Sequence, residues 1–260
     1  MDFWLPFFVI GFGLAAAAYA IARRIRLMAI VDLIWTAGLG IAGLLYVLSA
    51  DNVSGRSWLV WTVLALWSFR LTIHLLRDRV LRGHEDPRYQ ALANYWGDHA
   101  GRNFFGLFLV QIVFVALFLI PFGAAANNSS DLWRLSDFMA LGIAVVALLG
   151  ETLADRQLAG FRAQPDNSGK VCREGLWRYS RHPNYFFEWV FWWAFVAFAW
   201  GAVNWWVSLL GPAAMYCFLR YLTGIPYAER SSLKRRGEAY RNYQQTTSAF
   251  FPWIPHKPRP

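Results

Sequence analysis

Gly175–Trp193 reads GLWRYSRHPNYFFEWVFWW and joins a basic loop to a segment that is almost wholly aromatic and aliphatic. Pro183 is placed to begin a helix, because its missing N–H group would have no partner in the first turn in any case. Asn184 and Glu188 are four residues apart and therefore share one face of that helix. A carboxylate such as Glu188 is costly inside a membrane and usually has a function there. This stretch predicts a membrane-spanning helix with a binding site at its start, where backbone N–H groups favour an anion.

The apolar composition indicates a membrane protein. Of the 260 residues, 57% are hydrophobic and 18% aromatic, and the mean hydropathy is +0.30. Several uncharged runs of about 18 to 22 residues are long enough to cross a bilayer. We therefore expect an all-α polytopic protein with seven transmembrane segments, at 3–22, 28–50, 58–76, 104–124, 138–158, 185–200 and 205–223.

The basic residues predict the orientation. Of the 25 Lys and Arg, all but Arg56, Arg70 and Arg134 fall in the loops after the first, third and fifth segments or in the C-terminal tail. Cytoplasmic loops are enriched in these residues. We expect the N-terminus outside, the C-terminus in the cytoplasm and, in a bacterium, location in the inner membrane. The net charge of +9 then marks topology and does not indicate a nucleic-acid partner.

Other sequence features limit the class of protein. No repeat or linker divides the chain, so we expect one domain over 1–260. Cys172 and Cys217 are too few for a disulfide framework and are expected to be free thiols. The first apolar run lacks a basic region and a clear cleavage site, so no cleavable signal is expected. The histidines and cysteines show no metal-ligand spacing, and no metal, glycine-rich dinucleotide motif or required protein partner is predicted.

Further polar groups lie at the expected cytoplasmic ends of the segments. There are three such groups. The first is Glu151, Asp155 and Arg162. The second is Asp32 with Trp35 and Arg70, and the third is His74, Arg77 and the turn 85–89. Spacings of four and seven place the first group near one helical face. Ion-pair networks, a buried Asp–Arg pair and a solvated turn are the structural alternatives for these groups. Together they suit a large anionic cofactor from the cytoplasm and a lipophilic substrate from the bilayer.

The quoted stretch resembles the C-terminal motif of the steroid 5α-reductase family, in its bacterial branch of membrane proteins. The most specific part is Asn-x3-Glu within Gly175–Glu188, and the similarity covers most of the chain from about residue 70. It extends to Glu151-x3-Asp155-x6-Arg162, to Glu85-Asp86-x-Arg88-Tyr89, and to the tail residues 240–243 and 248–252.

The resemblance implies a seven-helix reductase that uses NADPH to saturate the C=C bond of an enone such as a Δ4-3-ketosteroid. Asn184 and Glu188 would then bind the nicotinamide half of the cofactor. The remaining cofactor-binding residues, within 70–260, would be Arg77, Arg88, Glu151, Asp155, Arg162, Lys170, Arg178, Tyr179, Arg181 and His182. Guanidinium groups suit a 2′-phosphate, so we expect NADPH to be preferred over NADH.

The substrate side departs from the family pattern. Eukaryotic members polarise the substrate carbonyl with a Tyr before the third-span arginine, and the spacing from Arg77 puts His74 at that position. Asp32 would orient His74, Trp35 would contact the substrate, and His74, Asp32 and Glu188 are the expected catalytic residues.

Two other classes of protein remain open. Membrane methyltransferases that use S-adenosylmethionine, of the isoprenylcysteine and phospholipid type, share the Arg-His-Pro-x-Tyr element. Asn184 after Pro183, with Asp155 and Arg162 upstream, favours the reductase. A scaffold or transporter would not require acids and arginines gathered at one membrane face.

Overall fold

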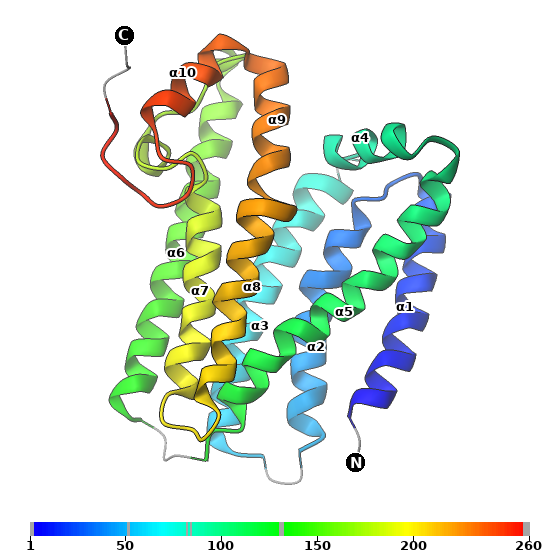
Figure 1. The fold of residues 1–260 in the computed structure, drawn as a ribbon, viewed down its shortest axis with the longest axis vertical. Helices are drawn as coiled ribbons and strands as arrows, with labels where there is room; N and C mark the ends of the chain where they lie inside the picture. Colours follow the sequence, from blue (N-terminus) through cyan, green and yellow to red (C-terminus); the bar gives the residue numbers. More distant parts are fainter. Residues whose placement is uncertain (1–2, 51–52, 82, 84, 130–132, 257–260) are drawn as a thin grey trace. The chain divides into compact units, whose positions relative to one another are not determined.

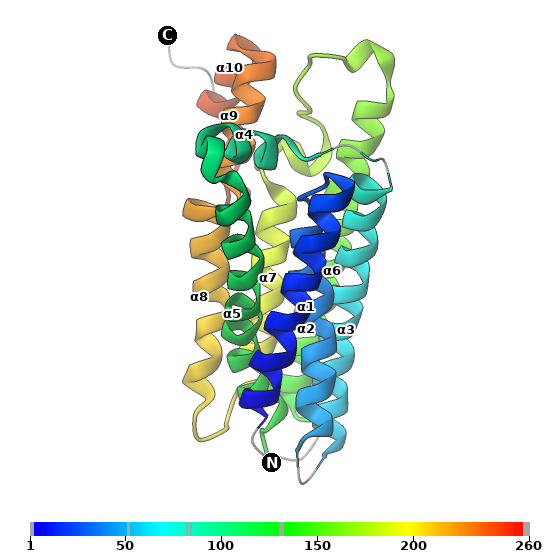
Figure 2. The same cartoon turned by 90° about the vertical axis from the view of Figure 1, so that its right-hand side faces the viewer.

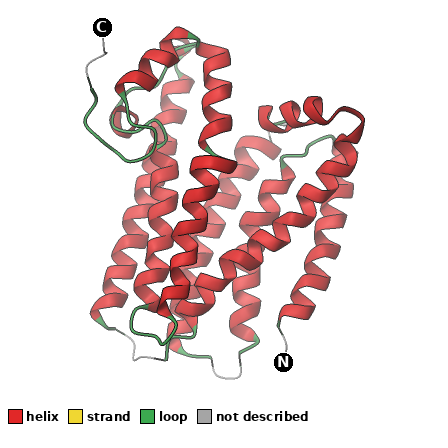
Figure 3. Ribbon diagram, viewed as in Figure 1, coloured by secondary structure: helices red, strands yellow, loops and turns green. Residues whose placement is uncertain are grey.

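The structure is a computed structural model and describes residues 3–50, 53–81, 83, 85–129 and 133–256. Every long regular element within those ranges is a helix (Figures 1 and 3). The chain forms two compact units. The first comprises Met1–Leu132 and Phe198–Ser208, and the second Trp133–Ala197 and Leu209–Pro260.

In the first unit, four long helices pack side by side, with α2 against α3 and α5, and α1 against α5 (Figures 1 and 2). A short amphipathic helix, α4, lies across the end at which α1 finishes and α2 begins. The bounds are Trp4–Ile25 (α1), Ile30–Leu48 (α2), Gly55–Leu75 (α3), Pro87–Trp96 (α4) and Ala100–Ala126 (α5).

Large apolar side chains and small contact residues hold this bundle together. Trp67, Phe108 and Phe118 are fully buried between the helices. Ser68 Oγ donates to the Thr36 carbonyl at 2.7 Å, which ties α3 to α2. Interfaces between membrane helices favour small residues of this kind, because the backbones can then approach closely.

The second unit is built on two long helices and a C-terminal helical region. The long helices are α6, Leu135–Ala163, and α7, Pro183–Ala199, most of which belongs to this unit. A 3₁₀ turn, Trp205–Leu209, leads through α8 and a π-helical turn to the polar helices α9 and α10. Their bounds are Leu210–Cys217 (α8), Phe218–Leu222 (π turn), Ile225–Arg236 (α9) and Glu238–Thr246 (α10).

Five helical stretches are long and apolar enough to cross a membrane: Trp4–Ile25, Ile30–Leu48, Gly55–Val80, Pro87–Ala126 and Leu135–Ala163. They match the first five segments expected from the sequence and are consistent with an integral multi-pass membrane protein in contact with lipid. The sixth expected segment forms α7, which has 17 residues. The seventh consists of a 3₁₀ turn, the short helix α8 and a π-helical turn. The count of seven spans, the orientation and the single domain stay predictions.

Candidate functional site

The short turn before α7 is fixed to α6 by hydrogen bonds. Trp177 Nε1 donates to the Ala154 carbonyl at 2.9 Å, and the Leu176 amide donates to Gln157 Oε1 at 2.9 Å. Gly175 begins this 3₁₀ turn with φ of 55°, a conformation that favours glycine. A Cβ at Gly175 would also collide with the Gln157 side chain. The sequence Gly-Leu-Trp therefore fixes where α7 starts relative to α6.

The next contact brings the two helices unusually close. Gly150 of α6 faces Phe187 of α7, and a Cβ at Gly150 would overlap the Phe187 ring. Glu151 follows directly and is buried, with 5% of its surface exposed. The missing side chain at Gly150 thus lets α7 lie against the acidic face of α6.

Asn184 and Asp155 meet across this interface. Asn184 Nδ2 donates to Asp155 Oδ1 at 3.3 Å. A carboxylate only accepts hydrogen bonds, so the amide nitrogen of Asn184 faces Asp155 and its oxygen points elsewhere. That oxygen, Oδ1, is buried, and no donor from the described part of the chain reaches it. Glu188, one turn further along the same face, is 6% exposed. The start of α7 therefore presents a buried acceptor beside two acids.

Arg181 and His182 are held by Glu229 of α9. Arg181 Nε donates to Glu229 Oε1 at 2.7 Å, and His182 Nε2 lies 3.3 Å from the same oxygen. Gln244 Nε2 donates to Glu229 Oε2 at 2.8 Å, and Arg181 Nη1 donates to the Gln244 and Thr247 carbonyls at 3.0 and 2.5 Å. These partners lie within the protein and favour a structural role for Arg181 over the predicted role in phosphate binding.

The protonation states in this clamp follow from burial and hydrogen bonding. Burial alone would raise the pKa of Glu229, but hydrogen bonds from His182 and Arg181 outweigh it and lower the pKa to about 2. Burial lowers the pKa of His182 below its usual 6.5, although Glu229 opposes the shift. At neutral pH the clamp therefore contains a carboxylate, a guanidinium and a neutral imidazole.

The C-terminal tail closes the same corner. The Arg181 amide donates to the Ser248 carbonyl at 2.8 Å, and Ser180 Oγ donates to the Phe250 carbonyl at 2.9 Å. The Trp253 amide donates to the Tyr179 carbonyl at 2.9 Å. Residues 248–253 thus run along residues 179–181 and form what we call the C-terminal strap.

Several predicted cofactor residues lie exposed near this corner. Arg162 is at the end of α6, Lys170 is in the loop that follows, and Arg178 lies in the turn before α7. Arg178 lies over the ring of Tyr179, with 6.0 Å from its Cζ atom to the ring centroid, and Tyr179 is 42% exposed. Their exposure leaves these side chains accessible to a ligand.

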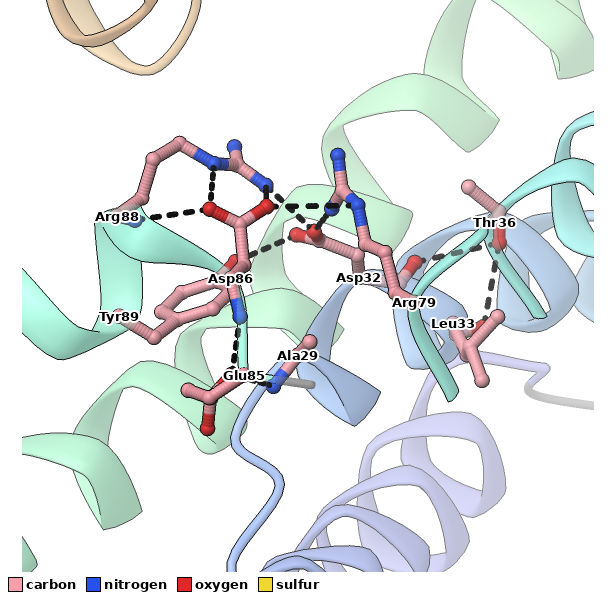
Figure 4. A network of polar contacts seen from close by, with 9 residues as sticks. All are labelled: Ala29, Asp32, Leu33, Thr36, Arg79, Glu85, Asp86, Arg88 and Tyr89. Carbon is pink, nitrogen blue, oxygen red and sulfur yellow. Dashed lines mark hydrogen bonds and ion pairs between the residues drawn. The ribbon is translucent and has the colours of Figure 1, made fainter. Parts of the chain in front are cut away.

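A second polar network lies in the first unit and involves Asp32 (Figure 4). Asp32 Oδ2 pairs with Arg79 and with Arg88 Nη2, the latter at 2.8 Å, while Tyr89 OH donates to Asp32 Oδ1 at 2.6 Å. Asp86 caps α4 by accepting from the Arg88 amide at 2.8 Å and also accepts from Arg88 Nε at 3.1 Å. The network holds α4 against the start of α2.

Glu85 lies beside this network and also connects the segment before α4 to the start of α2. Glu85 accepts from the backbone amides of Met28 and Ala29, the second at 3.0 Å. Because Arg88 is shared between Asp32 and Asp86, the network favours a structural role for Arg88 over phosphate binding.

The residues predicted on the substrate side lie on α2 and α3 of this unit. The ion-pair partners of Asp32 within the described residues are Arg79 and Arg88, so the Asp–Arg pair considered as a structural alternative forms with these two arginines. His74 is exposed on α3, and Arg77 is exposed in the π-helical turn, Leu76–Val80. The orientation of His74 by Asp32 stays a prediction.

Trp35 packs into the interior of the same bundle. Its ring contacts those of Trp67 and Phe118 at centroid distances of 5.3 and 5.6 Å. These ring contacts indicate a packing role for Trp35, and its predicted contact with substrate stays a prediction.

Sequence reasoning missed Glu229, Gln244 and Arg79. Glu229 precedes Arg230 in a polar helix and reads as an ordinary solvated charge. Arg79 is hidden among the basic residues after the third apolar run. A usable signal for Glu229 was its place as the single acid of α9, three residues after Pro226 and ahead of a basic run.

These features define the class: the chain is an all-helical multi-pass membrane protein with a buried hydrogen-bond acceptor at a helix start and basic side chains nearby. The chain belongs to the DUF1295 family, described as a protein of unknown function, which it matches over residues 18–247. That family is associated with steroid 5α-reductase-like membrane proteins. No curated protein and no solved structure matches the chain.

Proposed function

We propose that the protein is an NADPH-dependent reductase that saturates the C=C bond of a lipophilic enone, with a Δ4-3-ketosteroid converted to its 5α-dihydro form. The buried Asn184 Oδ1 carries this proposal. A buried acceptor without a donor costs about 1 to 3 kcal/mol. A ligand that donates an N–H group offsets this cost, and the carboxamide of a nicotinamide is such a group.

The surrounding residues fit the same group. Asp155 holds the Asn184 amide in one orientation, and Glu188 adds a buried carboxylate one turn along the face. NADPH supplies a hydride when it is bound. The exposed Arg162, Lys170 and Arg178 would provide charge-assisted hydrogen bonds to its phosphates.

The substrate carbonyl also needs a partner. Addition of hydride to the β-carbon of an enone places negative charge on the carbonyl oxygen, which a hydrogen-bond donor stabilises. We keep His74 as this donor, since an imidazole ring carries an N–H group that can donate. Asp32 is engaged by two arginines, so we assign it the role of positioning α4. The proposal places the cofactor loops in the cytoplasm, as the charge distribution predicts.

Binding and turnover on detergent-purified protein test this function. The wild-type protein should bind NADPH and not S-adenosylmethionine. Asn184→Ala should weaken NADPH binding about 10- to 100-fold, because one buried hydrogen bond is lost. Asn242→Ala, at an exposed position of α10, is the matched control and should change nothing.

A second variant, Glu188→Gln, tests the rate of reduction. Reduction of a Δ4-3-ketosteroid should slow about 30- to 1000-fold while the melting temperature is kept. Binding of S-adenosylmethionine in place of NADPH would favour the methyltransferase alternative. Unchanged NADPH affinity in Asn184→Ala would refute the role given to its side chain.

A further inference from the structure

A groove with a volume of about 360 Å³ lies in the second unit, between α7, α8 and the C-terminal strap. Pockets that hold small ligands have volumes of about 300 to 1,000 Å³ and mostly apolar walls. No charged residue lines this groove. Four aromatic residues from three separate segments line it, namely Trp189 and Trp193 of α7, Tyr216 of α8 and Phe251 of the strap.

Contacts between the aromatic rings form this wall without a ligand. The Trp189 ring contacts those of Trp193 and Tyr216 at centroid distances of 5.7 and 6.3 Å. It contacts the Phe251 ring at 5.5 Å. Trp189 Nε1 already donates to the Pro212 carbonyl at 3.1 Å. Because a polar group buried without a partner is costly, the groove suits an apolar chain better than a polar ligand.

The groove is elongated and reaches the surface. Leu209 and Tyr216, which both line it, are seven residues apart, so it extends roughly 10 Å at 1.5 Å per residue. This is about a third of the hydrocarbon thickness of a bilayer. Trp193 and Phe251 are 37% and 47% exposed, so the groove opens to the surroundings of the protein. In a membrane protein those surroundings include acyl chains.

A positive charge lies beyond one end of the groove. Arg220 follows Tyr216 by four residues, and its Cζ atom is 5.4 Å from the centroid of the Tyr221 ring. The Tyr221 ring in turn contacts the Tyr216 ring at 6.0 Å. No carboxylate in the described part of the chain pairs with Arg220. Glu229, the acid of the following helix, is engaged by other side chains.

We propose that this groove binds one acyl chain of an anionic phospholipid and that Arg220 contacts its phosphate. The apolar chain would lie against the aromatic wall. The guanidinium matches phosphate oxygens, and a long basic side chain near the end of an apolar segment extends towards the headgroups. In the expected topology Arg220 is near the cytoplasmic end of segment 205–223, where anionic lipids attract basic residues.

A bound lipid would also stabilise the strap. Phe251 forms part of the groove, and its neighbour Phe250 accepts a hydrogen bond from Ser180 before α7. A ligand that binds only the folded protein raises its stability. The lipid therefore should favour the closed position of residues 248–253.

Native mass spectrometry of the detergent-purified, full-length protein tests the site. The two probes are phosphatidylglycerol and a diacylglycerol with the same acyl chains but no phosphate. Ala213→Trp places a large side chain in the groove from an exposed position and should weaken binding of both lipids at least about tenfold. Ala17→Trp, at an exposed position of α1, is the matched control and should change neither affinity.

The charge is tested separately. Arg220→Gln should weaken binding of phosphatidylglycerol about fivefold and that of diacylglycerol less than twofold. Arg230→Gln removes the same charge from an exposed position of α9 and should leave both affinities within about twofold of the wild type. Circular dichroism on heating, without added lipid, checks that Ala213→Trp folds. If it does not fold, the Arg220→Gln comparison decides by itself.

Three results would overturn the proposal. The first is unchanged lipid binding in a folded Ala213→Trp protein, and the second is an equal effect of Arg220→Gln on the two lipids. The third is one-for-one displacement of phosphatidylglycerol by a Δ4-3-ketosteroid in the wild type but not in Ala213→Trp, which would assign the groove to the lipophilic substrate. The lipid site does not depend on the reductase function, since the variants of each proposal are measured with different ligands.

Discussion

Glu229→Gln should destabilise the second unit strongly, although Glu229 lies in a polar helix. The substitution removes the negative charge that Arg181 and His182 face and keeps the shape of the side chain. Removing one partner of a buried ion pair costs about 3 to 5 kcal/mol. Because Gln still offers an acceptor oxygen, we expect the lower end, about 3 kcal/mol. With about 2 to 4 °C per kcal/mol for domains of this size, the melting temperature should fall roughly 6 to 12 °C.

The pH dependence of this effect has a definite sign. The pKa of Glu229 falls from 4.5 to about 2 on folding, so its charge stabilises the folded state above pH 4.5. That stabilisation disappears as the pH falls from 4.5 towards 2. The difference in melting temperature between wild type and Glu229→Gln should therefore be largest at pH 7 and should become smaller as the pH falls below 4.5. His182, with its lowered pKa, adds a separate loss of stability in both proteins as the pH falls below 6.5.

Cys172 provides the assay. Its thiol is buried in the second unit, whereas Cys217 is exposed. In a Cys217→Ser background, the labelling of Cys172 by a thiol-reactive fluorophore during heating reports the unfolding of this unit. Glu238→Gln, which breaks the exposed pair with Arg241, is the control and should cost less than about 1 kcal/mol. A wild-type melting temperature for Glu229→Gln at pH 7, or an equal loss in the control, would refute the reasoning.

Two further predictions concern topology and the first unit. Reporter fusions after residues 25, 90, 170 and 245 should all report a cytoplasmic location, and a periplasmic signal at 170 would contradict the orientation. Asp32→Asn should lower the free energy of unfolding by about 3 kcal/mol, because Arg79 and Arg88 then share one fewer carboxylate. Tryptophan fluorescence on heating measures this, with the exposed Asp98→Asn as control, and equal stability of the two variants would contradict the role of Asp32.

The helices were predictable because hydropathy depends only on local sequence. The ends of the expected segments 3–22, 28–50 and 104–124 differ from those of α1, α2 and α5 by a few residues at most. The last expected segment was continuous in hydropathy, but the chain there forms 3₁₀, α and π turns. Changes between helix types depend on packing and backbone geometry, which apolar composition does not encode.

The polar sites were predictable only where their members lie on one helix or on neighbouring helices. Asp155 and Asn184 carried a signal through helical spacing, and the structure brings them together. Glu229 contacts Arg181 from 48 positions away, and only the packing of α9 and the C-terminal strap creates that contact. The family resemblance assigned Arg88 to the cofactor, whereas its contact with Asp32 could not be read from the sequence.

The C-terminal strap has a consequence for biosynthesis. Ser248 and Phe250, which are made after all of the apolar segments, supply the acceptors for the Arg181 amide and for Ser180 Oγ. The corner that positions the start of α7 can therefore close only after every apolar segment has already been made. Until then Asn184 and Glu188 lack part of the framework that orients them, and the nascent chain has no complete site with which to bind a ligand.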